Sequence, residues 1–401
     1  MSDAPRPALG SRALFPKLAW RASLNHAGIS PASVAVERAL AEIADDYARR
    51  GAAAYPTWAE RRRRLKDKLA RLIGAPDHAD LAITQNTTRG VSDVALGLPW
   101  KRGERVILFE GEFPSNVTPW QRAAELFGLE VVFLRAADFL ETDEPGLARL
   151  EAELAKGARL VAVSAVEFST GVRMPIARMA ALAHAAGAEL FVDAVQAVGA
   201  VPLDVAAAGI DYLACGSHKW LMGVEGAGFL YVRPDRFAAL RGTTAGWLSH
   251  EDALTFLFEG PGRLRHDRPL RRDSSLFEGA NVSAASAAAL DASVDLLLAL
   301  GPAAIHAHVN ALLDALEPAF VARGFRSLRR RDAAGRSAML CVLPPAGVSV
   351  VDLHRELGAR GVATATPDGA LRLSPHWPNG PDEIPAITSA LDDALAAVRR
   401  P

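Results

Sequence analysis

Short apolar runs alternate with alanine-rich amphipathic segments along most of the chain. The apolar runs are bounded by polar residues or glycine and have the length of buried strands. The segments between them repeat apolar residues at helical spacing; the stretch 175–186, for example, has proline in its first turn and Gly187 after its end. This alternation predicts an α/β protein with a mostly parallel sheet between helices. The predicted strands are 105–109, 130–134, 160–164, 189–192, 212–215 and 228–232.

The pattern changes at about residue 284. Two long helical segments, 284–300 and 302–323, lead into an apolar strand-like run at 338–343, and a final helix is expected from Asp382. This order predicts a second, smaller α+β domain. We therefore expect a large domain and a small domain, with the N-terminal segment joining the small one; the predicted boundaries are 21–283, 284–401 and 1–20.

Composition and charge restrict the class of partner. The 401 residues are 50% hydrophobic, enough for about two cores, and 45 basic residues nearly balance 46 acidic ones. Such a balance gives no field that would attract nucleic acid or a membrane. The start of the chain lacks the apolar core of a signal peptide, and no apolar stretch is long enough to span a bilayer. Cys215 and Cys341 lie in apolar runs without metal-like spacing, so we predict a reduced, cytoplasmic protein without a metal site.

Two clusters of arginine are interpreted as solvated surface. Arg61 to Arg64 continue into a segment whose apolar residues recur at helical spacing, which places the charges on the outer face of a helix. The second cluster, Arg326 with Arg329 to Arg331, has no interleaved aromatic residues. Neither cluster therefore predicts a nucleic-acid site.

Candidate chemistry is concentrated where two apolar runs end. The run at 212–215 is followed by Gly216-Ser217-His218-Lys219, and the run at 189–192 is followed by Asp193. A partly desolvated lysine with a lowered pKa is a nucleophile that traps carbonyl groups. Pyridoxal phosphate requires such a lysine for its Schiff base and a carboxylate that keeps its pyridine nitrogen protonated. Lys219 and Asp193 together therefore predict a pyridoxal-phosphate site.

With these elements the sequence resembles the class V aminotransferases of the fold-type I pyridoxal-phosphate enzymes, which include cysteine desulfurases, kynureninases and isopenicillin-epimerase-like proteins. The resemblance runs from Leu24-Asn25-His26-Ala27-Gly28 to Arg372-Leu373-Ser374-Pro375 and rests on ordered Asp-x-x-Gln and Ser-His-Lys motifs. It implies the fold of PLP-dependent transferases of type I, with a seven-stranded-type sheet in the large domain. It also implies pyridoxal 5'-phosphate as cofactor, an amino acid as substrate, and a homodimer with the active site at the subunit interface.

A helix N-terminus is expected to hold the cofactor phosphate. Thr87 and Thr88 follow an apolar run and precede a helical stretch, so they are expected to cap that helix, either as plain N-caps or as hydroxyl donors to an anion. The resemblance makes Thr88 a phosphate donor together with Ser217 and His218. It adds Asn281 from the partner subunit.

The cofactor ring needs a stacking partner and a contact to its phenolic oxygen. Phe113 is the expected stacking residue, although it is also a plausible core phenylalanine. Gln196, three residues after Asp193, is expected to reach the phenolic oxygen; otherwise it is a surface glutamine. Relatives carry an asparagine near the Phe168 position, and this chain does not, so Glu167 or Ser169 is the candidate replacement.

Arg372 is the expected partner of the substrate carboxylate, because a guanidinium binds a carboxylate through two parallel hydrogen bonds. Without the resemblance it would be an exposed arginine of an alternating strand. The resemblance places Asn25 and His26 near the same carboxylate. His26 is equally compatible with a structural role.

These residues predict an enzyme in which Lys219 removes or shuttles the α-proton of an amino acid while Asp193 stabilises the protonated pyridine. We expect an aminotransferase. The alternatives are a lyase, either a C–S lyase or kynureninase-like, an epimerase, and more remotely a non-catalytic PLP-binding module. A nucleotide-binding enzyme is disfavoured because the glycines at 223–228 lack the G-x-G-x-x-G order.

The sequence argues against one activity of the resembled family, cysteine desulfuration. Cysteine desulfurases carry a nucleophilic cysteine on a loop shortly before the carboxylate-binding arginine, and residues 361–368 contain no cysteine. Cys341 lies in an apolar run and is interpreted as core. We therefore expect that the chain is not a cysteine desulfurase.

Overall fold

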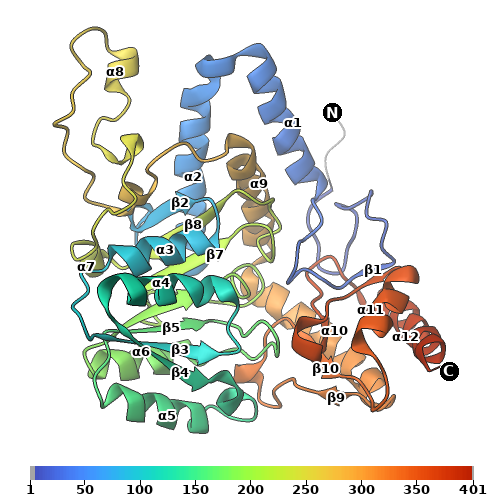
Figure 1. The fold of residues 1–401 in the computed structure, drawn as a ribbon. Helices are drawn as coiled ribbons and strands as arrows, with labels where there is room; N and C mark the ends of the chain where they lie inside the picture. Colours follow the sequence, from blue (N-terminus) through green and yellow to red (C-terminus); the bar gives the residue numbers. More distant parts are fainter. Residues whose placement is uncertain (1–4, 400–401) are drawn as a thin grey trace.

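A seven-stranded sheet forms the centre of the molecule in the computed structural model, which describes residues 5–399 (Figure 1). The strand order is β2-β8-β7-β6-β5-β3-β4, and all neighbours are parallel except β8, which is antiparallel to β7 and β2. The predicted mostly parallel α/β sheet is confirmed. The strands are β2 (Leu81–Thr84), β3 (Arg105–Glu110), β4 (Glu130–Arg135), β5 (Leu160–Ser164), β6 (Glu189–Asp193), β7 (Tyr212–Gly216) and β8 (Gly228–Val232).

Helices cover both faces of this sheet because alternate residues of each strand point to opposite sides. In β3, Val106 and Leu108 pack in one cluster with Trp120, whereas Ile107 and Phe109 pack in the other. The first cluster lies under α3 (Thr87–Gly97) and α4 (Thr118–Phe127); the second lies under α2 (Tyr55–Ile73), α5 (Glu144–Leu154) and α6 (Ile176–Ala185). Strands buried on both faces explain the nearly continuous apolar runs in the sequence.

A smaller α+β region packs beside the sheet (Figure 1). Its three-stranded antiparallel sheet has the order β12-β10-β9, and a two-stranded parallel sheet joins β1 to β11. Because β1 pairs with β11 and Phe15 packs on Trp377 at 5.3 Å between ring centroids, the start of the chain lies against its C-terminal part. The elements are β1 (Ala22–Ser23), β9 (Arg326–Ser327), β10 (Leu340–Leu343), β11 (Val362–Ala363), β12 (Leu371–Leu373), α10 (Pro302–Val321), α11 (Val350–Ala359) and α12 (Ile384–Val398).

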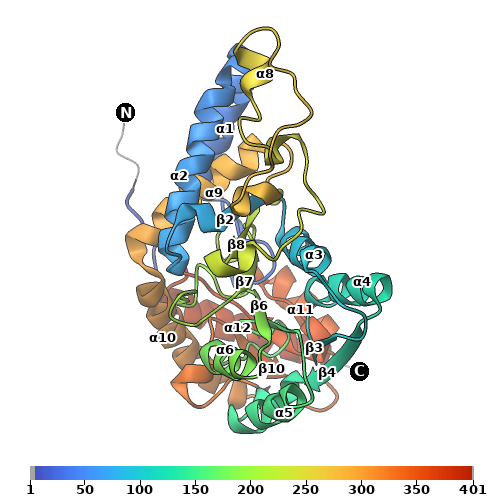
Figure 2. The ribbon, with the colours of Figure 1, turned by 90° about the vertical axis from the view of Figure 1, so that its left-hand side faces the viewer.

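Three helices rise above the sheet: α1 (Val34–Arg49), α2 and α9 (Ala284–Leu300). A small cluster that includes Ile43, Trp58 and Ala288 holds them together. A long loop after α7 (Pro234–Phe237) carries the short α8 (Thr255–Phe258) to the same end of the molecule, beside α1 and α2 (Figure 2). Nothing in this arrangement tests the predicted domain boundaries, which stay a prediction.

Some local predictions need correction. Pro175 is the N-cap residue before α6 and lies outside the helix, because its ψ of 64° is not helical. The first arginine cluster is surface, with Arg61 and Arg63 paired to Glu42, Glu60 and Asp67. The solvated interpretation is wrong for Arg329 and Arg330. Their side chains are buried, because carboxylates neutralise them: Asp314 and Glu317 for Arg329, and the distant Asp143 with the neighbouring Asp332 for Arg330.

No single helix among residues 5–399 is long and apolar enough to cross a membrane; α9 and α10 satisfy the length and hydropathy criteria only together, as a pair bent by 77°.

Candidate active site

The carboxyl ends of neighbouring strands bring the predicted residues to one edge of the sheet. Asp193 ends β6, and its strand neighbours are Ser164 at the end of β5 and Ala214 in β7. Lys219 follows the end of β7 by three residues. Ligands of α/β proteins bind at this edge, because loops there converge above the strand ends.

Lys219 is a partly buried amine without an ion pair in the described chain. Its Nζ lies 5.3 Å from the centroid of the Phe113 ring, and no carboxylate lies within 4 Å of it among residues 5–399. Burial lowers the pKa of Lys219; Asp193 acts in the opposite direction, and the positive charge of Arg372 lowers the pKa further. More of the amine is therefore unprotonated at neutral pH than for an exposed lysine.

Two carboxylates lie next to each other at the strand ends. Asp193 is buried, its Oδ1 accepts a hydrogen bond from Val195 N at 2.9 Å, and burial raises its pKa to about 6. The Glu112 carboxylate accepts hydrogen bonds from Ser164 N and Ser164 Oγ, each at 2.5 Å. Burial and the nearby Asp193 raise the pKa of Glu112 to about 8. Sequence reasoning missed Glu112, although an acidic residue directly before the expected stacking residue was a visible signal.

The N-terminus of α3 lies at the same edge of the sheet. Asn86 is its N-cap, because the Asn86 side chain accepts from Arg89 N at 2.8 Å, so the expectation that Thr87 and Thr88 cap the helix is wrong. They are instead its first two residues, whose backbone N–H groups have no partner within the helix. Thr88 Oγ1 donates to Ser115 Oγ at 2.8 Å, and Thr87 is buried.

Ser217 and His218 flank this edge but differ in exposure. Ser217 is fully buried and its hydroxyl donates to the carbonyl of Val224. His218 is half-buried, and burial lowers its pKa, with the charge of Lys219 acting in the same direction. Both residues are within the turn that presents Lys219.

Phe113 presents an open ring face: it is 43% exposed and packs edge-to-face on Phe168 at 5.4 Å between centroids. A core phenylalanine would be covered. Gln196 is buried, with its Nε2 donating to Ala27 O at 3.2 Å and its Oε1 accepting from Trp220 Nε1 at 2.8 Å. Ser169 Oγ donates to Glu167 Oε2 at 2.8 Å, so this hydroxyl is used inside its own turn.

Arg372 lies in β12 and reaches the same region. Its Nη1 donates to the Phe168 carbonyl at 2.8 Å, and its buried Nε has no hydrogen-bond partner in the described part of the chain. Burial lowers its pKa. Asn25 bridges to Ser374, two residues after Arg372, and the Asn25 Oδ1 is also buried without a described partner. The two residues expected to hold a substrate carboxylate are therefore close in the fold and incompletely paired.

His26 is held by structural contacts. It is fully buried, its Nδ1 lies 2.8 Å from Ser30 Oγ, and Ser30 Oγ donates to the carbonyl of Lys219 at 2.6 Å. Its ring packs on His376 at 5.3 Å between centroids. Burial, and then His376, lower the pKa of His26 well below its usual range. This neutral histidine links the N-terminal segment to the turn that carries Lys219.

Asn281 is not brought to Lys219 within one chain. It is exposed and lines an apolar groove with Tyr47, Trp58, Trp247 and Phe258, none of which belongs to the Lys219 site. Its predicted action from a partner subunit stays a prediction.

Both cysteines are fully buried near the site. Cys215 is in β7, and Cys341 in β10 pairs with Arg372 across the small sheet. Burial raises the pKa of both thiols, that of Cys341 to about 12.

The arrangement fits pyridoxal phosphate. An amine with a lowered pKa lies over an open aromatic face, a carboxylate stands at the strand end beside it, and a helix N-terminus opens at the same edge. These groups match the aldehyde, the ring with its nitrogen, and the phosphate of the cofactor.

Comparison with known proteins gives a consistent result. The family described as Aminotransferase class-V matches residues 49–371. Isopenicillin N epimerase of Streptomyces clavuligerus is 30% identical over 82% of this chain and 83% of that protein. A probable cysteine desulfurase of Pyrococcus abyssi is 28% identical over 80% of each. The crystal structure of the cysteine desulfurase CsdA from Escherichia coli superposes with a TM-score of 0.83 at 25% identity, covering 96% of this chain and 98% of that one.

These comparisons overturn one prediction. The exclusion of cysteine desulfurases is wrong, since proteins of that name match most of the chain and share its fold. The exclusion rested on the absence of a cysteine from one loop, residues 361–368. A single loop does not separate the chain from relatives that share the rest of its length.

Proposed function

Because the chain belongs to the class-V aminotransferase family and has pyridoxal phosphate as its cofactor, we propose that it acts at the α-carbon of an amino acid and that transamination is its reaction. The observation that carries this proposal is the partly buried Lys219 amine, which lies 5.3 Å above the centre of the Phe113 ring and has no ion pair among residues 5–399. When bound, the cofactor supplies an aldehyde for condensation with amines and a ring that takes up electrons from the α-carbon.

Lys219 binds the cofactor and then moves the proton. Its lowered pKa makes the amine a better nucleophile than that of an exposed lysine. With the cofactor and an amino acid bound, the same Nζ would be placed to take a proton from the α-carbon and to return it. The absence of a carboxylate within 4 Å of Nζ in the described chain leaves the lone pair of the amine available.

Asp193 and Arg372 are expected to bind different charged groups: Asp193 the pyridine nitrogen, and Arg372 the substrate carboxylate. Asp193 ends β6 at the edge where the cofactor ring is expected, and its Oδ1 is held by Val195 N. In its charged form Asp193 would keep the pyridine nitrogen of the bound cofactor protonated. Arg372, fixed through Nη1 by the Phe168 carbonyl, has donors left for the substrate carboxylate.

A second candidate reaction is the release of sulfur from cysteine. The relatives named cysteine desulfurase favour it. Epimerisation is the third outcome compatible with a proton moved by Lys219, and one relative is named an epimerase.

The test is to add a panel of amino acids, including L-cysteine, to the cofactor-loaded protein without any keto acid. Lasting conversion of the cofactor to its amine form, read from visible absorption, supports transamination and identifies the donor. Sulfide release from L-cysteine, or racemisation with recovery of the starting spectrum, contradicts transamination in favour of the other reactions. Absence of any covalently bound cofactor contradicts the whole proposal.

We also propose a cytoplasmic homodimer in which Asn281 of one subunit contacts the cofactor phosphate bound to the other. The exposure of Asn281 and its apolar surroundings support this proposal. Light scattering coupled to gel filtration tests the dimer. The Asn281→Ala variant is expected to retain the dimer and to bind the cofactor less tightly.

A further inference from the structure

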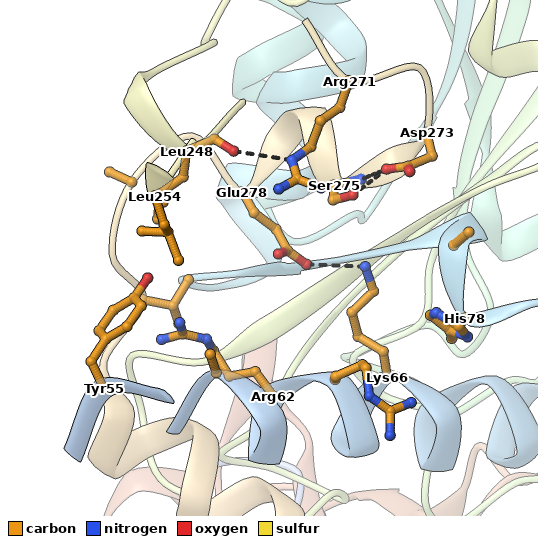
Figure 3. A pocket seen from close by; sticks show the side chains of 15 residues that line it. Tyr55, Arg62, Lys66, His78, Leu248, Leu254, Arg271, Asp273, Ser275 and Glu278 are labelled. Carbon is orange, nitrogen blue, oxygen red and sulfur yellow. Dashed lines mark hydrogen bonds and ion pairs between the residues drawn. The ribbon is translucent and has the colours of Figure 1, made fainter. Parts of the chain in front are cut away.

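A second cavity lies at the outer edge of the sheet, away from Lys219. It has a volume of about 330 Å³ and is bounded by α2 on one side and by residues 248–282 on the other (Figure 3). The edge strand β2 runs beside it, because Ile83 N donates to Glu278 Oε1 at 2.8 Å. None of its lining residues belongs to the Lys219 site.

The acidic groups that line this cavity already have partners within the protein. Lys66 is 8% exposed, and its Nζ lies 3.4 Å from Glu278 Oε1. The other carboxylate of the lining, Asp273, accepts a hydrogen bond from Ser275 N at 2.8 Å and closes its own turn. The two acidic groups are therefore engaged before any ligand arrives.

Two arginines of the cavity have no such partner. Arg62 lies over the Tyr55 ring at 5.4 Å from its centroid, and Arg271 donates through Nε to Leu248 O at 3.3 Å. Neither guanidinium lies within 4 Å of a carboxylate in residues 5–399. Figure 3 shows Arg271 on the far wall, Arg62 rising from α2, and Glu278 between them.

The lining has more positive than negative charge. The lining includes Arg62, Arg63, Lys66 and Arg271 but only two acidic residues, Asp273 and Glu278, whereas the whole chain has a formal net charge of −1. Arg63 is also paired with Glu60 and Asp67 outside the lining. A concave site of one sign attracts ions of the other sign. Leu248, Leu254 and Val282 add apolar wall beside the arginines.

We propose that this cavity binds a small organic dianion, with one acid group held by Arg62, the other by Arg271, and its carbon skeleton against the apolar wall. The volume lies at the lower end of the range for small-molecule sites, which limits the ligand to a compact acid. A planar guanidinium is suited to a carboxylate or phosphate group. The site does not depend on the proposed reaction.

The test is calorimetric titration of the full-length, cofactor-loaded protein with glutarate. Saturable binding is expected, and it is expected to weaken about 10- to 100-fold in the double variant Arg62→Gln, Arg271→Gln, because charge-assisted hydrogen bonds are lost. Arg63→Gln is the matched control: Arg63 is one residue along the same helix, but Glu60 and Asp67 already hold its guanidinium. It is expected to bind like the unmodified protein.

A third variant distinguishes glutarate binding in this cavity from glutarate binding at the active site. Arg372→Lys is expected to keep the glutarate affinity of this cavity, and loss of binding in that variant would assign the heat to the active site and overturn the proposal. Absence of saturable binding, or equal affinity in the double variant, would overturn it as well.

Inorganic phosphate tests whether the carbon skeleton of the ligand contributes to binding. It is expected to bind more weakly than glutarate, and equal affinity would overturn the assignment to an organic acid. Arg62→Gln alone, which leaves Arg271 in place, is expected to show an intermediate affinity.

Discussion

Two lysines, the partly buried Lys219 and the buried Lys66, show how the same residue type acquires different roles. Lys66 in α2 is buried with the Glu278 carboxylate at 3.4 Å. Lys219 after β7 is partly buried over an aromatic ring, and the carboxylate that acts on its pKa, Asp193, lies beyond ion-pair distance. A lysine paired with a carboxylate supports the structure; one removed from water without such a pair loses its proton more easily and becomes reactive.

The largest expected effect separates the two lysines directly. Lys219→Ala is expected to abolish covalent attachment of the cofactor and to slow turnover by about a thousandfold or more, because both the nucleophile and the base are lost. Absorption spectra and steady-state rates measure this. Lys66→Ala is the control; it is expected to keep the covalent cofactor and to lower the free energy of unfolding by about 1–3 kcal/mol, since Glu278 loses its partner. A cofactor spectrum lost in Lys66→Ala but kept in Lys219→Ala would contradict the comparison.

The next effect concerns the second cation of the active site. Arg372→Lys is expected to lower kcat/KM for the amino-acid substrate by about 10- to 100-fold, mainly through KM, because an ammonium group cannot form two parallel hydrogen bonds to a carboxylate. Cofactor binding is expected to stay unchanged. Arg360→Lys, in a surface pair with Glu356, is the matched control. A fall in kcat at constant KM would assign Arg372 to another step.

Glu112 extends the comparison to a buried acid. Its pKa in the folded protein is about 8, above the ordinary value of 4.5. Below pH 4.5 the group is protonated in both states and contributes nothing to the pH dependence. Between 4.5 and 8 the unfolded chain releases the proton while the folded protein keeps it, so stability falls as pH rises, by up to a few kcal/mol as an order of magnitude.

Replacing Glu112 tests whether this residue makes stability fall as the pH rises. Glu112→Gln in the cofactor-free protein is expected to flatten the decrease in stability between pH 5 and about 8, measured by urea unfolding. Glu110→Gln, on the exposed end of β3, is expected to leave the decrease unchanged. An unaltered slope in Glu112→Gln would show that Glu112 is ionised in the folded protein.

The smallest expected effect is on stacking. Phe113→Ala is expected to weaken cofactor binding by about 3- to 10-fold, because an aromatic contact contributes about 0.5–1.5 kcal/mol. Phe133, 41% exposed on the edge strand β4, gives the control Phe133→Ala, in which the affinity is expected to be unchanged. Equal losses in both variants would remove Phe113 from the site.

Most of the main sheet was predictable, since strands buried on both faces leave continuous apolar runs, and six runs matched strands to within one residue at their ends. The antiparallel pairing of β8 with β2 was not predictable, because strand direction depends on how the chain returns over the sheet. The burial of Arg330 could not be predicted either, since its partner Asp143 comes from a distant part of the sequence.

The sequence by itself determined the chemistry of the site: Lys219, Asp193 and Arg372 have the residue types and order that pyridoxal-phosphate chemistry needs. Only the tertiary structure decided which charges are paired. It brought Glu112 beside Asp193, left Lys219 without an ion pair, gave Lys66 to Glu278, and left Arg62 and Arg271 on opposite walls of a cavity. The reason is physical: the pKa and reactivity of a charged group depend on burial and on neighbours within a few ångströms, and in this fold those neighbours come from segments far apart in the sequence.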